Sequence, residues 1–255
     1  MTKTLKSKLN NNELALGGWA MIGTPAIIEI MAKAGFDWVC IDLEHTATTY
    51  EQVENMVRAA DVANVPTLVR LTSNDENQIK RVMDNGASGI IVPMVKTATE
   101  AKQALKAMHY PPLGHRGVSL HRGTDFGSRF DEYRKWLKEE AVCIVQIEHI
   151  DAVNNCEEIL SVDGVDGYFM GPYDLSASMG LTGQLDHPDV KAAMAKVYEI
   201  GKRLNKSGGL HIVEPDETKL KSAIEQGFNF LAYSIDTRII DTICRSGIAL
   251  ARGLK

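Results

Sequence analysis

The sequence predicts a single α/β domain of the (β/α)8, or TIM-barrel, class that spans residues 1–255. Short apolar segments rich in branched residues recur eight times, and helical patterns lie between them. Neither glycine-rich nucleotide fingerprint, GxGxxG or GxxxxGK[ST], is present, so we expect no nucleotide cofactor. Eight alternations in 255 residues favour a closed barrel over a doubly wound open sheet.

The predicted strands are nearly continuous in hydrophobicity, which is typical of parallel strands buried on both faces. They comprise LALGGWAMI (14–22), WVCIDLE (38–44), PTLVRL (66–71), GIIVPMV (89–95), VCIVQIE (142–148), GYFMGP (167–172), SGGLHIV (207–213) and FNFLAYSI (228–235).

Amphipathic stretches with apolar residues three and four positions apart predict the intervening helices. They comprise residues 25–35, 49–63, 75–86, 97–108, 216–227 and 237–253. Thr24 and Pro25 read as an N-cap and first helical residue, and Gly35 and Gly86 as helix-ending glycines. The connection between the fourth and fifth strands, residues 109–140, is long and irregular. Because long loops in compact domains are usually functional, we expect it near the active-site mouth.

Composition excludes several classes of function. The formal net charge is -5 and the basic residues are scattered, so nucleic-acid binding is not expected. The first residues carry no apolar signal segment, and no apolar run is long enough for a bilayer. We therefore expect a cytoplasmic protein without a membrane partner. The four cysteines match no zinc or CxxC spacing.

Polar and ionisable residues gather where the predicted strands end. In a barrel these ends converge on one mouth, where barrel enzymes place their chemistry. The residues are Trp19, Asp42, Glu44, His45, Arg70, Pro93, Gln146, Glu148, Asp174, His211, Ser234 and Asp236. Glu148 and Asp174 follow neighbouring strands, and two carboxylates held close together suit a hard divalent ion such as Mg2+ or Mn2+. The alternative is a pair of solvated loop acids.

Arg70 closes a strand that has no other charge. One interpretation is an anion site for a carboxylate or a developing oxyanion, and the other is a structural ion pair. His45 follows two acids directly and is a candidate general base. His109, His115, His121, His149, His187 and His211 are weaker candidates.

Several stretches together resemble the metal-dependent pyruvate aldolases of the HpcH/HpaI family, which include aldolases for 4-hydroxy-2-oxoheptanedioate and for 2-keto-3-deoxy sugar acids. The matching stretches are GFDWVCIDLEHT, VPTLVRL, IKRVMDNGASGIIVPMV, YPPLGHRGVS, VQIEHIDAVNN and GVDGYFMGPYDLSASMG. The motifs IDLEH, VQIE and GPYDLS, in this order, are specific for the superfamily. They say much less about which substrate the protein uses.

The resemblance implies a role for each of the residues in the predicted mouth. Glu148 and Asp174 would bind Mg2+ or Mn2+, with Co2+ as a further option. Arg70 would steady an enolate, His45 would transfer a proton, and Asp84 would support the basicity of that histidine. The remaining members of the implied site are Asp42 in the catalytic set and Trp19, Gln146, Pro172, Tyr173 and Asp174 around the bound keto acid.

The implied reaction is reversible cleavage of a 4-hydroxy-2-oxo acid to pyruvate and an aldehyde through a metal-stabilised enolate. Pyruvate or oxaloacetate and an aldehyde are therefore the expected partners. A Schiff-base aldolase needs an inward lysine, and Lys96, the nearest, falls past its strand. The family commonly forms a hexamer, a trimer of dimers with an exchanged C-terminal helix, so residues 237–253 are expected to pack on a neighbour.

Three stretches depart from the family pattern: Tyr173 before the metal-binding acid, AYSID in strand eight, and SLHRGTDFGSRFDEY in the long connection. These stretches lie where the aldehyde is expected to bind, so the sequence does not predict which aldehyde is the acceptor. Two alternative functions also stay open. One is a carbon–carbon-forming synthase on the same scaffold, as in citrate-forming siderophore enzymes, and the other is a non-catalytic barrel.

Overall fold

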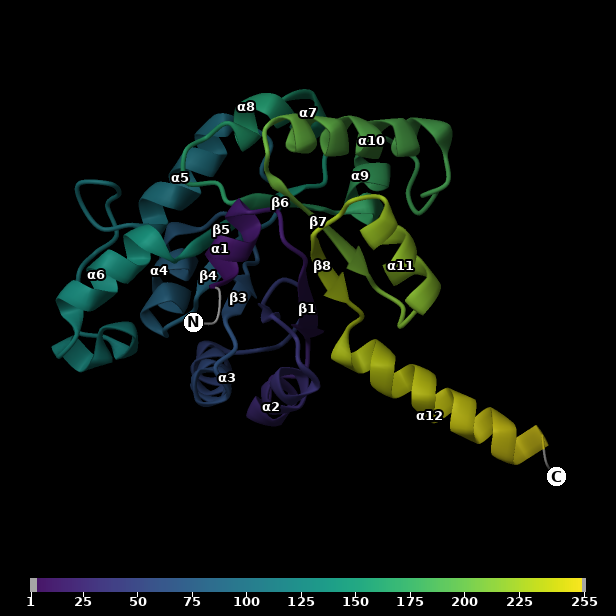
Figure 1. Ribbon diagram of the computed structural model, residues 1–255, viewed down its shortest axis with the longest axis horizontal. Coiled ribbons are helices and arrows are strands. Elements are labelled where there is room, and N and C mark those ends of the chain that lie inside the picture. Colours follow the sequence, from purple (N-terminus) through teal and green to yellow (C-terminus); the bar gives the residue numbers. More distant parts are fainter. Residues whose placement is uncertain (1–3, 254–255) are drawn as a thin grey trace.

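The computed structural model describes residues 4–253 as a closed barrel of parallel strands surrounded by helices (Figure 1). Every strand pairs in parallel with the next, and β1 pairs with β8 to close the barrel. The strands are β1 (Ala15–Ala20), β2 (Trp38–Asp42), β3 (Thr67–Arg70), β4 (Gly89–Val92), β5 (Val142–Ile147), β6 (Gly167–Met170), β7 (Ser207–Ile212) and β8 (Phe230–Tyr233). Each lies within its predicted segment, which confirms the fold class. The ends of the predicted domain, residues 1–3 and 254–255, lie outside the described residues.

Six of the helices coincide with predicted stretches. They are α2 (Pro25–Ala34), α3 (Tyr50–Ala63), α4 (Glu76–Asp84), α5 (Ala98–Met108), α11 (Glu217–Glu225) and α12 (Asp236–Gly253). The sequence patterns did not predict α1 (Leu5–Asn10), η1 (Arg122–Gly127), α6 (Phe130–Glu139), α7 (Ile150–Asn154), α8 (Cys156–Leu160), α9 (Pro172–Ser178) or α10 (Pro188–Arg203).

Local chemistry sets the helix ends. Thr49 and Gln52 form a capping box that satisfies two amides at the start of α3. Gly35 ends α2 with a φ of 96°, a backbone conformation that glycine adopts at little cost. Thr24 and Pro25 stand at the predicted positions, although the hydroxyl of Thr24 makes no capping hydrogen bond.

The inside of the barrel is filled by large aromatic side chains. Trp38 and Phe230 stack with their ring centroids 4.3 Å apart, and both are fully buried. Gly17 is required beside them, because a Cβ there would lie 2.1 Å from the Trp38 ring. This packing fills the barrel interior below the mouth, which leaves the carboxyl ends of the strands as the place where barrel enzymes build their sites.

The connection 109–140 does not border the mouth of its own barrel, so that expectation is wrong within one chain. It follows the end of α5 and precedes β5, so it lies at the amino ends of the strands. Arg116 and Tyr133 from this segment bond to Asp84 and to the carbonyl of Met83, at the end of α4. The connection is also partly helical, because it contains η1 and α6.

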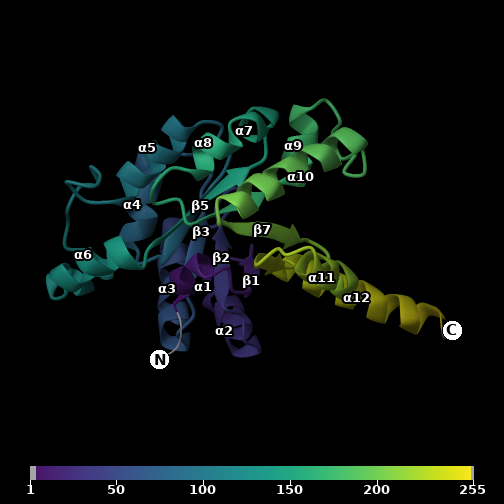
Figure 2. The same cartoon turned by 45° about the horizontal axis from the view of Figure 1, so that its top comes forward.

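Helix α12 extends away from the barrel, as the two views agree (Figures 1 and 2). Its first residue, Asp236, is buried and accepts hydrogen bonds from the amides of Met21 and Ile22. The rest of the helix buries no residue in this chain. Four large apolar side chains are exposed along it: Ile240, Ile243, Ile248 and Leu250. Within residues 4–253, no helix is long and apolar enough to cross a membrane.

Candidate active site at the barrel mouth

A cavity with a volume of about 970 Å³ opens at the carboxyl ends of the strands. Strand ends supply Trp19, Arg70, Gln146 and Glu148 to its lining, and the bend after β2 supplies His45. Pro172, Tyr173 and Asp174 join them from the first turn of α9. The structure thus brings most of the predicted site residues to one cavity.

Arg70 is held by two carboxylates. Its Nε and Nη2 donate to Asp42 Oδ1 and Oδ2 at 2.9 and 2.6 Å, and its Nη1 lies 3.0 Å from Glu44 Oε2. Asp42 is fully buried. Burial alone would raise the pKa of Asp42, but the hydrogen bonds and charge of Arg70 outweigh it and lower that pKa. The structural ion pair is therefore present, and the bidentate contact fixes the plane of the guanidinium.

Two rings support the guanidinium from within the barrel. The Cζ of Arg70 lies 4.8 Å from the centre of the Trp19 ring, which is a cation–π contact. The Trp19 ring in turn stacks on His211, with centroids 4.6 Å apart. Trp19 is 1% exposed. Its ring therefore packs behind Arg70 and offers little surface of its own to a substrate.

Glu148 follows β5 and is 2% exposed, which excludes the solvated-acid alternative for this residue. Its Oε1 accepts from the amide of Met94 and its Oε2 from Nε2 of Gln146, both at 2.7 Å. Burial, with added repulsion from Glu44 and Asp174, raises the pKa of Glu148 to about 7. Asp174 itself is exposed, on the third residue of α9 rather than at a strand end.

The residues present fit a hard divalent cation. Burial is the main cause of the raised pKa of Glu148, and the negative charges of Glu44 and Asp174 add to it. A cation beside these carboxylates would offset both effects. Oε1 of Gln146 is buried and has no hydrogen-bond partner within the described chain. No group of three or more His, Cys, Asp or Glu that could hold a metal occurs among residues 4–253. Two carboxylates plus substrate and water oxygens is a set that Mg2+ accepts.

His45 and Asp84 do not meet within one chain. The His45 side chain is 63% exposed at the mouth, and its nearest acid is Glu44, at 3.9 Å. Asp84 ends α4 at the opposite end of the barrel, where it bonds to Arg116 at 2.6 Å and lies 3.3 Å from His121. The predicted support of His45 by Asp84 therefore requires Asp84 of another copy of the chain.

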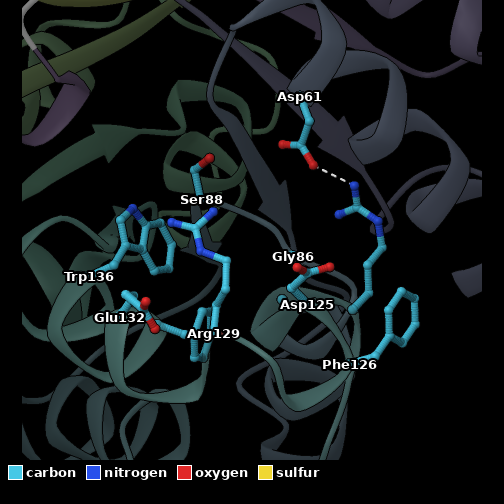
Figure 3. A pocket seen from close by; sticks show the side chains of 11 residues that line it. Asp61, Gly86, Ser88, Asp125, Phe126, Arg129, Glu132 and Trp136 are labelled. Atoms are coloured by element: carbon cyan, nitrogen blue, oxygen red, sulfur yellow. Dashed lines mark hydrogen bonds and ion pairs between the residues drawn. The ribbon is translucent and has the colours of Figure 1, made fainter.

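A second cavity, of about 620 Å³, lies at the amino ends of the strands (Figure 3). Arg122 is paired with Asp61. Figure 3 shows Arg129 beside Trp136 and Ser88. The residues that line it include Glu132 and Asp125 but bring no two buried carboxylates together. Its charges are on the surface, so we place the candidate site at the mouth.

The fold is a (β/α)8 barrel, and its strand ends carry a clamped arginine and a buried acid whose pKa is raised to about 7. The chain belongs to the HpcH/HpaI aldolase/citrate lyase family, which matches residues 16–241. A hydroxypyruvate/pyruvate aldolase of Sagittula stellata is 38% identical over 93% of this chain and 93% of its own length.

Two solved structures share the fold over 98% of this chain. A HpcH/HpaI aldolase/citrate lyase family protein from Burkholderia cenocepacia has a TM-score of 0.92 at 32% identity, with all of that chain covered. The citrate synthase SbnG has a TM-score of 0.86 at 27% identity, with 98% of that chain covered.

Sequence reasoning underrated two residues. The sequence predicts Glu44 only as a strand-end acid, whereas in the structure Glu44 is the second carboxylate that pairs with Arg70. His211 was a weaker candidate, and the structure places it in the cavity against Trp19. The inward position of His211 follows from strand alternation, because its neighbours Leu210 and Ile212 point outward.

Proposed function

We propose that the protein is a divalent-metal-dependent aldolase that reversibly cleaves a 4-hydroxy-2-oxo acid to pyruvate and an aldehyde. The observation that carries the proposal is the shared cavity of Arg70 and Glu148, a fixed guanidinium and a buried acid that repels its acidic neighbours. Membership of the HpcH/HpaI family and 38% identity to a hydroxypyruvate/pyruvate aldolase support it.

We assign to Arg70 the stabilisation of the keto oxygen, which gains negative charge as the carbon–carbon bond breaks. Asp42 occupies two of its five N–H donors, which holds the guanidinium in one orientation. The Nη1 side faces Glu44, whose single contact a substrate oxygen can replace. A preorganised cation at that place stabilises an enolate oxygen without any rearrangement of its own.

Glu148 and Asp174 are the residues that would hold Mg2+ or Mn2+, and Co2+ would suit the same oxygen donors. When bound, such an ion supplies Lewis-acid stabilisation of negative charge on the keto acid. Gln146 fixes one oxygen of Glu148 through its amide and leaves its own carbonyl oxygen free. The amide of Met94 fixes the other oxygen, so the carboxylate has one orientation in the cavity.

We assign to His45 the transfer of the proton in the reaction. In cleavage its imidazole accepts the proton of the C4 hydroxyl, the C3–C4 electron pair passes into the keto group, and the aldehyde leaves. Protonation of the resulting enolate at C3 gives pyruvate. In condensation the same imidazole returns the proton to the new hydroxyl.

The lysines that line the cavity do not support the rival Schiff-base route. Lys191 and Lys219 stand on α10 and α11 rather than on strands, and Lys191 is paired with Asp186 at 2.8 Å. A Schiff-base lysine is instead made nucleophilic by a dry pocket or a neighbouring cation.

We also propose a hexamer, a trimer of dimers in which α12 packs on a neighbouring copy. The exposed isoleucines of α12 support it, since a helix that buries no apolar face in its own chain gains stability by burying that face elsewhere. Ile243→Asp should dissociate the assembly in light scattering. Val62→Asp, at a still more exposed apolar residue on α3, should leave the mass unchanged. Cytoplasmic location stays a prediction.

A synthase that joins a keto acid to an enolate donor is the second candidate, and the likeness to the citrate synthase SbnG favours it. The identity to SbnG, 27%, is lower than the 38% to the Sagittula aldolase. Product analysis with oxaloacetate and acetyl-CoA separates the two, because a citrate-forming synthase gives citrate and free CoA, whereas an aldolase leaves acetyl-CoA unchanged.

The test of the proposed function is pyruvate release from a panel of 4-hydroxy-2-oxo acids, with Mn2+ and with EDTA. We expect release that needs the metal, and no adduct when borohydride is added with pyruvate. Release that is insensitive to EDTA, or a borohydride-trapped lysine adduct, would contradict the proposal.

A further inference from the structure

His211, on β7, lines the mouth cavity but has no part in the reaction described above. Its ring lies in a fixed place, because one face stacks on Trp19 at 4.6 Å and the edge of Phe169 approaches it at 6.4 Å. A ring held by two neighbours presents its nitrogens in constant directions, which is what a recognition group requires.

One hydrogen bond sets the tautomer of this ring. Nε2 of His211 lies 3.0 Å from the carbonyl oxygen of Ser234. A carbonyl only accepts, so Nε2 carries the proton and Nδ1 is left as an acceptor with a free lone pair. Nδ1 has no hydrogen-bond partner among residues 4–253 and is not one of their buried unpaired atoms, so on this cavity-lining residue it is the nitrogen available to a ligand.

Ser234 is held firmly as the partner of His211. Its φ of 60° is unusual for a residue with a side chain. Its amide donates to Ile212 O at 2.7 Å and its hydroxyl donates to Val213 O at 3.0 Å, which stabilises that conformation.

The imidazole is neutral at physiological pH. Burial, with the charge of Arg70 adding to it, lowers the pKa of His211 to about 4. A neutral ring whose only free nitrogen is an acceptor does not bind a carboxylate or a carbonyl oxygen. It binds a group that donates a hydrogen bond, and in a keto acid or an aldehyde that group is a hydroxyl.

We propose that His211 determines specificity by accepting, at Nδ1, a hydrogen bond from a hydroxyl group of the substrate beyond the one that reacts. The proposal rests on the aldolase function proposed above and narrows its substrates to hydroxylated ones. The hydroxyl belongs either to the nucleophile, a 3-hydroxy-2-oxo acid, or to the acceptor, a 2-hydroxyaldehyde.

The experiment compares kcat/KM within two matched pairs of substrates, with Mn2+ present. Hydroxypyruvate is compared with pyruvate at one fixed aldehyde, and glycolaldehyde with acetaldehyde at fixed pyruvate. His211→Phe keeps an aromatic ring against Trp19 and removes the acceptor, and His211→Asn supplies an acceptor in a smaller side chain. Ser222→Ala, which changes an exposed hydroxyl on the α11 side of the same cavity, is the matched control.

We expect the wild type to prefer the hydroxylated member of one pair. His211→Phe should reduce that preference about threefold to tenfold, the effect of one neutral hydrogen bond. His211→Asn should restore part of it, and Ser222→Ala should leave it unchanged. Thermal unfolding followed by circular dichroism checks that each variant is folded.

Active His211→Phe enzyme with both preferences unchanged would overturn the assignment of His211 and leave the aldolase function standing. A folded wild type that turns over neither keto acid with Mn2+ would overturn the aldolase function, and the assignment with it. If His211→Phe does not fold, His211→Leu, which also removes the acceptor, takes its place, and an unchanged preference in His211→Leu contradicts the proposal. Phe169→Leu, which perturbs the same ring stack and leaves Nδ1 in place, is its control.

Discussion

Replacing Glu148 by glutamine should make the metal-free protein more stable at high pH and change it little at low pH. Glutamine has nearly the same shape and cannot ionise. In the folded chain the pKa of Glu148 is raised from 4.5 to about 7 by burial and by neighbouring acids. The folded state therefore keeps a proton that the unfolded chain has already lost.

The sign of the pH dependence follows from this difference. Stability falls with rising pH wherever the folded state binds more protons than the unfolded state. For Glu148 that interval runs from pH 4.5 to about 7, and the penalty is complete above it. At 1.36 kcal/mol per pKa unit, the stability gained by Glu148→Gln should grow by roughly 2 to 3 kcal/mol between pH 5 and pH 8.

The assay is urea unfolding followed by circular dichroism at both pH values, in EDTA. Glu29→Gln, an exposed glutamate on α2, is the matched control and should show no such pH dependence. A stability difference between Glu148→Gln and the wild type that is the same at pH 5 and pH 8 would refute the reasoning.

Two further substitutions test the geometry of the mouth. Gly171→Ala places a Cβ 2.4 Å from Oε2 of Glu148, so the carboxylate must move. We expect turnover to fall at least about tenfold. The control is Gly117→Ala, which has open space around its Cβ and should leave turnover unchanged. Normal turnover in Gly171→Ala would show that the orientation of Glu148 is unimportant. Asp42→Asn weakens the buried pair with Arg70 and should cost about 3–5 kcal/mol in urea unfolding, whereas a cost below about 1 kcal/mol would mean that the ion pair is not buried in solution.

The strands were predictable because strands covered on both faces read as unbroken apolar runs, and segments such as residues 142–148 have that pattern. The same pattern leaves the burial of Glu148 open, because an acid just past a strand end can also be a solvated loop residue, and the structure decides for burial. The sequence does not predict helix α6 because it lies in a long connection, directly after a glycine-rich stretch. Its position depends on contacts distant in the sequence, such as that of Tyr133 with the carbonyl of Met83.

The partners of the mouth residues were harder to predict than the residues themselves. Strand order places Arg70 beside Asp42, because β2 and β3 pair in register at those two residues. No local pattern indicates that Glu44 turns back onto the same guanidinium, or that His211 stacks on Trp19 across the barrel. Such contacts depend on side-chain directions inside a closed barrel, which strand patterns alone do not fix.

The most direct measurement is calorimetric titration of Mn2+ into the wild type, Glu148→Gln and Asp174→Asn in the presence of pyruvate. The account predicts binding to the wild type and a loss of affinity of at least about tenfold in each variant, accompanied by loss of pyruvate release. Wild-type affinity for Mn2+ in either variant, with turnover retained, would contradict it.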